Sequence, residues 1–293
     1  MLPLLAASPI TWGFVGNGRW GIDLPQERIL SEMAEIGFSA TEAGVPGFLP
    51  SQGQEAKSTL DRHGLRAVSG PVSFVIHEEG SLNIALDTVR LAGRRLLDMG
   101  GEVLITVPKP GNLNPGEKLT DDGWTRLGEG LDSVEELCSS MGLRQALHPH
   151  VGSLVETKED MERVMESSAC GWCLDTAHIE SGNFSPEDFM TLAGERVALV
   201  HIKDLDLDLG RQMVRHQIGF DDAIAKNVFV PLGDGDLDLA SILPLLPRDV
   251  WWVLEQDQAI AKTPQAGKGP KIDAARSLQR LQALLKDGQG RNN

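Results

Sequence analysis

Tyrosine is absent from the 293 residues, and only three cysteines are present. A catalytic phenol is therefore excluded, and three cysteines cannot form the disulfide framework of a small secreted protein. Basic residues are also scarce, because 27 Lys and Arg face 42 Asp and Glu, for a net charge of −15. This balance argues against nucleic-acid binding, which needs concentrated positive charge. It suits an enzyme that acts on a neutral or cationic small molecule.

Long apolar runs are missing as well. No stretch reaches the ~18–20 apolar residues of a membrane-spanning helix. The apolar start of the chain is short, contains Pro3 and has no Lys or Arg before it, unlike a secretory signal peptide. We therefore expect a cytoplasmic protein without membrane association.

Short apolar runs alternate with longer amphipathic segments along the chain. The predicted strands cover Pro9–Val15, Phe38–Glu42, Ala67–Val75, Glu102–Val107, Arg144–His150, Gly171–Asp175, Ala198–Ile202 and Trp251–Glu255. The predicted helices cover Gln26–Ile36, Glu55–His63, Leu82–Met99, Trp124–Met141, Lys158–Ser167, Pro186–Gly194 and Ala274–Lys286.

Eight strand and helix units over ~250 residues predict a closed (β/α)8 TIM barrel, of the α/β class, as a single domain over residues 1–293. An open, doubly wound sheet is the competing architecture. The irregular stretch 204–231 separates the last two predicted strands, and its length favours an insertion or an active-site lid. The polar residues 287–293 are predicted to be a flexible tail.

Groups that bind metals or move protons stand at the predicted ends of five strands. These groups are Glu42, His148 and His150, Asp175, His201 and Glu255, with Glu156 and His178 following shortly after strands five and six. One such residue alone is more often a hydrogen-bonded group or a helix cap than a ligand. The carboxyl ends of the strands form the mouth of a barrel. The recurrence of such residues at five strand ends therefore favours an active site there.

Imidazoles and carboxylates together predict a divalent metal site. Such a set suits Mn²⁺, Co²⁺, Zn²⁺ or Fe²⁺, and its carboxylates also admit Mg²⁺. His148 and His150 are expected on one face of the fifth strand, since side chains alternate with period two. We leave open which of the two histidines reaches the metal and which binds substrate.

Three other motifs are interpreted as structural. Residues 16–21 match the dinucleotide fingerprint G-x-G-x-x-G, but Pro25 would fall in the second turn of its helix, which disfavours NAD binding. Cys170 and Cys173 form an isolated C-x-x-C and are expected to be small buried thiols. Residues 233–236 (GDGD) lack the bidentate glutamate of a calcium loop.

Several strings together resemble the xylose-isomerase-like barrel superfamily of sugar isomerases, keto-sugar epimerases and endonuclease IV-type enzymes. They are HPHVGSLVET (148–157), CLDTAHIESG (173–182), HIKD (201–204), PLGDGDLDL (231–239) and LEQDQ (254–258). These strings, and WGIDLPQERILSEMAEIGFSATEAG (20–44), are similar in particular to the inosose dehydratases of inositol catabolism. The resemblance extends from Trp12 to about Gln258.

The resemblance implies a role for each candidate residue. The metal ligands would be His150, Asp175, His201 and Glu255, while Glu156 matches a catalytic acid/base carboxylate and His178 a substrate-contacting histidine. Within these positions we expect Glu156 to act as the base and His178 as the acid. Glu42, His148 and Lys203 would contact substrate. The chain departs from the epimerases at Leu207, where they carry an arginine six residues after the strand-seven histidine.

We therefore expect a metal-dependent lyase that dehydrates a cyclic polyhydroxy ketone, 2-keto-myo-inositol first, through an enediolate. Mn²⁺ or Co²⁺ is the favoured cofactor. A keto-sugar epimerase or isomerase is the alternative, since it shares the enediolate. An endonuclease-like role is opposed by the acidic charge, and a non-catalytic sugar-binding barrel would not need Glu156 and His178. The expected partner is the small polyol or keto-sugar substrate, and assembly into a homo-oligomer is left open.

Overall fold

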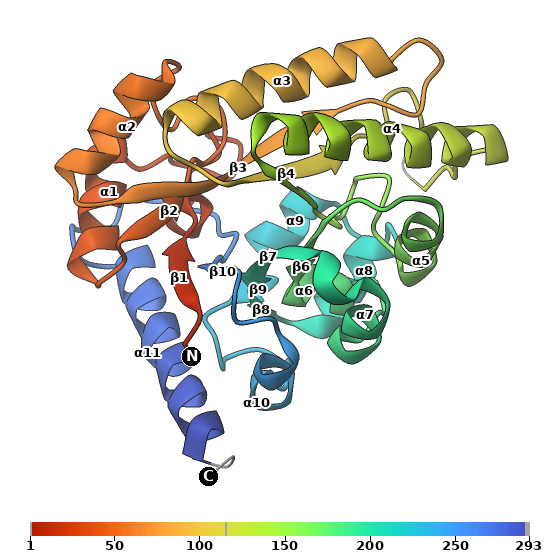
Figure 1. Cartoon of the computed structure of the whole chain (residues 1–293). Coiled ribbons are helices and arrows are strands. Elements are labelled where there is room, and N and C mark those ends of the chain that lie inside the picture. The colour runs from red at the N-terminus through yellow and green to blue at the C-terminus, as the bar shows by residue number, and fades with distance from the viewer. Residues whose placement is uncertain (1, 115, 291–293) are drawn as a thin grey trace.

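A computed structural model describes residues 2–114 and 116–290. Within these residues, eight parallel strands close a barrel in the order β1-β10-β7-β6-β5-β4-β3-β2 (Figure 1). The barrel strands are β1 (Leu4–Ala7), β2 (Ala40–Glu42), β3 (Arg66–Phe74), β4 (Val103–Pro108), β5 (Arg144–Leu147), β6 (Trp172–Asp175), β7 (Val197–Ile202) and β10 (Trp251–Leu254). The predicted (β/α)8 barrel is confirmed, and the open sheet is excluded.

Helices follow the strands and cover the outside of the barrel (Figure 1). They are α1 (Gln26–Glu35), α2 (Gly53–Arg62), α3 (Leu82–Asp98), α4 (Asp121–Met141), α5 (Lys158–Ser167), α6 (Thr176–Ser181), α7 (Pro186–Ala193), α8 (Leu207–Val214), α9 (Phe220–Ala225), α10 (Leu239–Ile242) and α11 (Pro270–Gly290). Because α11 continues to Gly290, only residues 291–293 of the predicted tail remain, and they lie outside the described residues.

The first strand lies earlier in the chain than the sequence predicts. Strand β1 is Leu4–Ala7, whereas Pro9–Trp12 of the predicted strand forms the 3-10 helix η1. Proline has no N–H for a sheet and suits the first turn of a helix. The Trp12 indole is buried and donates to Glu32 at 2.9 Å, which fixes this helical turn against α1.

The fifth strand ends three residues earlier than predicted. It stops at Leu147, so His148 and His150 lie in the loop after β5 and do not share a strand face as expected. Pro149 between them has no N–H to donate to a neighbouring strand. The two histidines are therefore placed by a loop at the barrel mouth.

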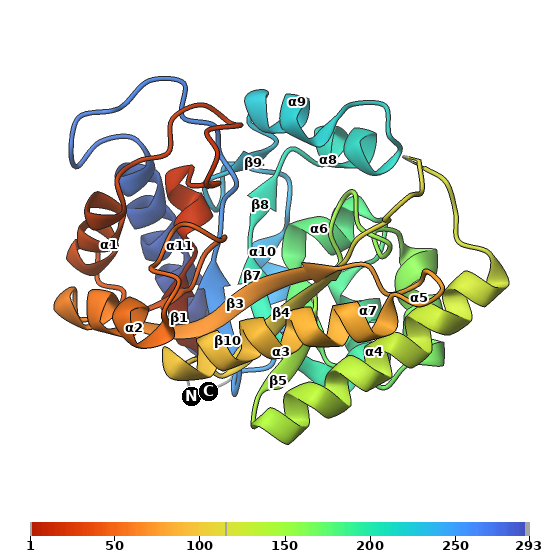
Figure 2. The ribbon, with the colours of Figure 1, turned by 90° about the horizontal axis from the view of Figure 1, so that it is seen from above.

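Segment 204–231 has its own secondary structure. Strands β8 (Asp204–Leu205) and β9 (Phe229–Val230) pair antiparallel and enclose α8 and α9. Figure 2 shows α8 and α9 together on one side of the molecule, with α9 near the loop that follows η1. In that loop the Trp20 indole donates to Asp221 of α9 at 2.8 Å, and Arg19 pairs with the same carboxylate at 2.5 Å.

Two aspartate side chains hold the two glycine-rich loops in place, one at residues 233–236 and one at residues 16–21. Asp204 binds the first of these loops. Its buried carboxylate accepts the N–H groups of Leu205, Gly233, Gly235 and Leu237 at 2.8–3.2 Å. A Cβ at Gly235 would stand 2.2 Å from Asp204 Oδ1, so the GDGD turn requires glycine there.

The glycine-rich loop at residues 16–21 is organised in a similar way. Asp23 accepts the N–H groups of Val15, Gly16 and Gly18 at 2.8–3.3 Å, and α1 begins only at Gln26. The loop amides that a dinucleotide phosphate would bind are therefore used within the protein.

The barrel interior is packed with small and branched side chains. Its inner layer consists of Ala6, Ala40, Val68, Val103, Ile105, Val107, Ala146, Cys173, Ala198, Leu199, Trp251 and Val253. Cys170 is also fully buried, and burial raises the pKa of its thiol to about 12. Among the residues described, no helix is both long and apolar enough to cross a membrane.

We predict that Asp204→Asn lowers the free energy of unfolding by about 2–4 kcal/mol. The new amide NH₂ would face N–H donors that now bind a carboxylate oxygen, leaving buried donors without partners. Urea unfolding followed by tryptophan fluorescence measures this loss. Asp208→Asn, on the exposed surface of α8, is the control and should change the unfolding free energy by less than about 0.5 kcal/mol.

Candidate active site at the carboxyl end of the barrel

Polar side chains converge where the barrel strands end. Glu42 and Asp175 are the last residues of β2 and β6, His201 lies in β7, and Glu255 directly follows β10. The strand register pairs His201 with Asp175 of β6 on one side and with Val253 of β10 on the other. The ends of these three strands therefore lie at the same height along the barrel. A cavity of about 180 Å³ opens here. Its polar lining includes Ser8, Glu42, Lys109, His148, His150, His201, Glu255 and Asp257.

His201 lies at the centre of the carboxylates. Its Nε2 is 3.1 Å from Glu42 Oε1, and its Nδ1 is 3.5 Å from Asp175 Oδ2 and 3.7 Å from Glu255 Oε1. Burial acts to lower the pKa of His201, but Cys173 and these carboxylates raise it well above its usual value. Burial acts to raise the pKa of Glu42, yet His201 and the Ser69 hydroxyl hold it below its usual value.

Asp175 serves two elements at once. Its Oδ1 accepts the N–H groups of Ala177 and His178 at 2.9 Å and so caps α6, a helix that the sequence pattern did not predict. Its Oδ2 is buried, makes no hydrogen bond and faces the site. The helix cap therefore fixes the direction of the second oxygen, and the same contact places His178 on the first turn of α6.

Lys203 is fully buried among three carboxylates. Its Nζ lies 2.6 Å from Glu255, 2.7 Å from Asp257 and 3.3 Å from Asp175. Burial acts to lower the pKa of Lys203, but Asp175 and the other carboxylates raise it well above its usual value. Lys203 was predicted to contact substrate. Here its ammonium has no exposed surface and instead neutralises the acidic side chains around it.

Three histidines form a second group beside the carboxylates. The ring centroids of His150 and His178 are 4.4 Å apart, and that of His148 is 5.4 Å from each. Burial lowers the pKa of all three imidazoles, so they are held neutral. Neutral imidazole is the form that ligates metals. His150 Nδ1 donates to the carbonyl of Val151 at 2.7 Å, which leaves its Nε2 for another partner.

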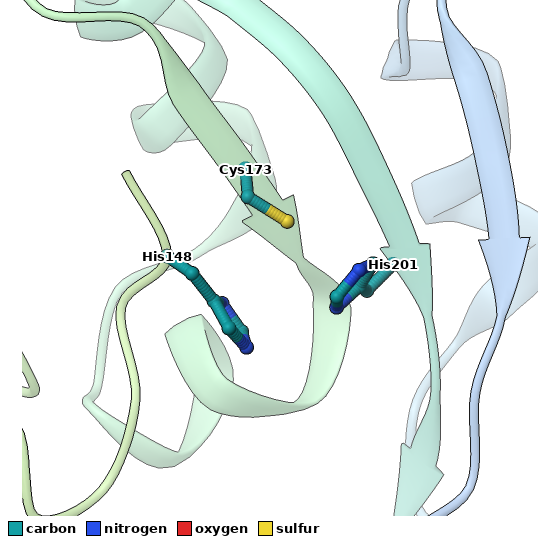
Figure 3. Close-up of side chains that lie close together, drawn as sticks. All are labelled: His148, Cys173 and His201. Atoms are coloured by element: carbon teal, nitrogen blue, oxygen red, sulfur yellow. The ribbon is translucent and has the colours of Figure 1, made fainter. Parts of the chain in front are cut away.

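A cysteine lies close to two of these histidines. Figure 3 shows the Cys173 side chain between His148 and His201, and one ligand atom from each lies within 4.8 Å of the others. Cys173 belongs to the inner layer of the barrel, and burial raises the pKa of its thiol. The predicted small, buried thiol thus lies beside two histidines of the polar site.

The residues at the mouth fit a divalent metal. Among the described side chains, the buried atoms without a hydrogen-bond partner include Nδ1 of His148, Oδ2 of Asp175, Nδ1 of His201 and both ring nitrogens of His178. Leaving a buried polar atom unpaired costs about 1–3 kcal/mol. Imidazole nitrogens and carboxylate oxygens so placed are the donors that a divalent metal takes. Two sets of residues each bring their ligand atoms within 4.8 Å of one another. One set is Glu42, His201 and Glu255, and the other is His148, His150 and His178.

Glu156 lies in a neighbouring cavity of about 350 Å³. Its carboxylate accepts the N–H of Gly152 at 2.9 Å and lies 3.1 Å from Nε2 of His216. Phe220 also lines this second cavity and packs at a tilt against His150, which lines the first, with ring centroids 5.1 Å apart. The structure thus gathers eight of the nine predicted site residues around one cluster, whereas Glu156 lines the second cavity.

Four residues of the two cavities were not among the predicted site residues. Asp257 and Lys109 line the first cavity, whereas His216 and Phe220 reach the second from the insertion. Asp257 follows Glu255 by two residues, and this position just after the last predicted strand could have identified it as a site residue. His216 and Phe220 follow no barrel strand, so nothing in their sequence positions links them to the mouth.

The chain belongs to the family described as xylose isomerase-like TIM barrel, whose model matches residues 30–281. It is 29% identical over 300 residues to inosose dehydratase of Geobacillus kaustophilus (strain HTA426), an alignment that covers 96% of this chain and 97% of the relative.

Solved structures share the fold. L-ribulose 3-epimerase superposes with a TM-score of 0.72 at 16% identity, over 100% of this chain and 97% of the other. The IOLI protein with a binding zinc atom superposes with a TM-score of 0.71 at 14% identity, over 97% of this chain and 98% of the other.

We predict that Lys203→Gln lowers the free energy of unfolding by about 3–5 kcal/mol. The substitution leaves buried carboxylates without their charge partner, the case in which breaking a buried ion pair is strongly destabilising. Chemical denaturation gives the value, with exposed Lys262→Gln as the matched control. An unchanged midpoint for Lys203→Gln would contradict the role assigned to this ammonium.

We also predict that Co²⁺, Mn²⁺ or Zn²⁺ raises the thermal midpoint of the chelator-treated protein by several degrees. A ligand that binds only the folded state at 100 times its Kd stabilises it by about 2.7 kcal/mol. His201→Gln should remove this shift, whereas His63→Gln, which alters the pair with Glu27 outside the site, should retain it. Equal shifts in the two variants would place the metal elsewhere.

Proposed function

We propose that the protein is a metal-dependent dehydratase of a cyclic polyhydroxy ketone, with 2-keto-myo-inositol as the first substrate. The observation that carries this proposal is the cluster of imidazole and carboxylate groups at the barrel mouth, where ring nitrogens of His148, His178 and His201 have no hydrogen-bond partner. The curated relatives named inosose dehydratase, similar over most of the chain, support the substrate class.

The proposed metal ligands are His150, Asp175, His201 and Glu255. When bound, a divalent metal would act as a Lewis acid toward the ketone. We favour Mn²⁺ or Co²⁺, and the donor set also suits Zn²⁺ or Fe²⁺. The zinc atom bound by the IOLI protein supports a divalent metal in this fold. Glu42 and His148 line the same cavity and would hold substrate oxygens.

Two groups of the chain move protons in the proposed reaction. Glu156 accepts the proton from the carbon next to the ketone, and the C–O bond of the neighbouring hydroxyl breaks. His178 donates a proton to that hydroxyl, which leaves as water. Burial keeps the pKa of His178 low, so its neutral imidazole takes up a proton from solvent before it gives one to the hydroxyl, and Glu156 returns its proton to solvent. The enol product then becomes a dione.

The position of Glu156 requires the insertion to act as a lid. Glu156 and Phe220 line the second cavity and Phe220 contacts His150, which lines the first, so in the proposed mechanism this contact opens when substrate binds and the two cavities join. Segment 204–231 contributes Phe220 and is tied to the loop after η1 by the exposed Arg19–Asp221 pair. Exposed ion pairs contribute little to stability, so the hydrogen bond from the Trp20 indole to Asp221 and the contact of Trp20 with Phe220 are the stronger part of this attachment.

Keto-sugar epimerisation or isomerisation is the second candidate. It begins with the same proton removal beside a carbonyl and could use the same cluster. Leu207, at the start of α8, stands where the epimerase pattern has an arginine, which favours dehydration. The mass of the product separates the two reactions, because an epimerase conserves mass and a dehydratase releases one water.

We predict that the metal-loaded protein converts 2-keto-myo-inositol to a product one water lighter, and that Glu156→Gln lowers kcat by about 10²–10⁴-fold. Mass spectrometry of timed reactions, with and without chelator, measures both effects. Glu159→Gln on the exposed face of α5 is the control and should keep wild-type turnover. Metal binding without any loss of water would contradict the dehydratase proposal and direct the search to epimerase substrates.

A further inference from the structure

The insertion brings a histidine to the carboxylate of Glu156. His216 lies in the connection between α8 and α9, and its Nε2 is 3.1 Å from Glu156 Oε1. The other carboxylate oxygen accepts the N–H of Gly152 at 2.9 Å. The Glu156 side chain is 9% exposed and that of His216 is 34% exposed, so the contact lies at the wall of the second cavity.

The backbone around His216 holds this side chain in place. His216 has a φ of +54°, a backbone conformation that residues other than glycine adopt only at a cost of about 1–3 kcal/mol. Its N–H donates to the carbonyl of Met213 at 2.9 Å. Opposite the ring, Gly116 also has a positive φ, and a Cβ there would stand 3.3 Å from the His216 ring. The imidazole therefore lies between Gly116 and Glu156.

The second cavity places few other charges near Glu156. Asp160 of α5, and Lys118 and Glu117 of the loop before α4, line it, and Lys118 lies 3.1 Å from Asp160. Most other walls are apolar and include Leu113, Leu119, Trp124, Val151, Leu154, Met213, Ile218 and Phe220. Within the described residues, His216 is therefore the titratable group that contacts the Glu156 carboxylate directly.

We propose that His216 is a positioning residue, which orients the carboxylate of Glu156 for proton transfer. This inference rests on the proposed function, in which Glu156 is the base. It makes the insertion part of the proton-transfer apparatus and assigns the second cavity to the part of the substrate that carries the reacting C–H.

The pair also predicts the direction of a pH effect. Burial raises the pKa of Glu156, whereas the Gly152 N–H, His216 and Lys118 lower it and Asp160 raises it. Without His216, the pKa of Glu156 therefore moves further upward. The base form of Glu156 is the active one, so the acid limb of the kcat/KM profile should move to higher pH.

The test compares His216→Gln and His216→Ala with Arg215→Ala, whose side chain is exposed on the same connection. We expect both His216 variants to lose about 10- to 100-fold in kcat at pH 7 and to keep KM within about twofold, because the substrate still binds but the base is misplaced. Their acid limbs should lie at higher pH than in the wild type. Arg215→Ala should match the wild type, and equal urea midpoints show that all variants fold.

A second measurement separates this inference from the proposed function. The Glu156 carboxyl is titrated by NMR in protein labelled with ¹³C-glutamate. Its signal is assigned as the one that disappears in Glu156→Gln. A higher Glu156 pKa in His216→Gln supports the pairing, even when 2-keto-myo-inositol is not the substrate. An unchanged Glu156 titration, or unchanged kcat and pH profile in both His216 variants of an active enzyme, would overturn the inference.

Discussion

The buried ammonium of Lys203 is the charge on which the barrel mouth depends. Asp175, Glu255 and Asp257 are nearly or fully removed from water, and each lies within 3.3 Å of its Nζ. Three carboxylates packed this closely need a positive partner, because burial strongly disfavours uncompensated negative charge. With Lys203 present they remain available as acceptors at the level where the strands end, and His201 completes the cluster.

The neutral histidines and the charged cluster divide the site into two chemical regions. Burial keeps His148, His150 and His178 uncharged, while His201, surrounded by carboxylates, has a raised pKa. Neutral imidazole nitrogens suit divalent transition metals, and carboxylate oxygens also admit Mg²⁺ or Mn²⁺. The same packing that excludes water from the barrel interior thus leaves metal-binding atoms unpaired at its edge.

The insertion links this edge to the rest of the protein through a few directed contacts. Asp204 fixes its start by gathering backbone N–H groups from the glycine turn near Gly235. Phe220 packs against His150, and His216 reaches Glu156. A segment outside the strand and helix repeat therefore contacts two proposed functional residues, each at a different cavity.

The repeat of strands and helices, and the end of each strand that carries polar residues, could be predicted from the amino-acid order alone. These features are local, since apolar periodicity and capping residues such as Thr157 act within one or two turns. Features that depend on distant neighbours could not be predicted in this way. Strand β1 forms at Leu4–Ala7 because β10 and β2 pair with it, and its four residues carry no strong signal of their own.

The same division holds for the candidate site. The sequence indicated Glu42, Asp175, His201 and Glu255, because parallel strands must end on the same side of a barrel. It did not indicate that Lys203 is buried among carboxylates, nor that Glu156 and Phe220 line a second cavity. Those facts arise from contacts between segments dozens of residues apart, whose geometry only the closed barrel and its docked insertion define.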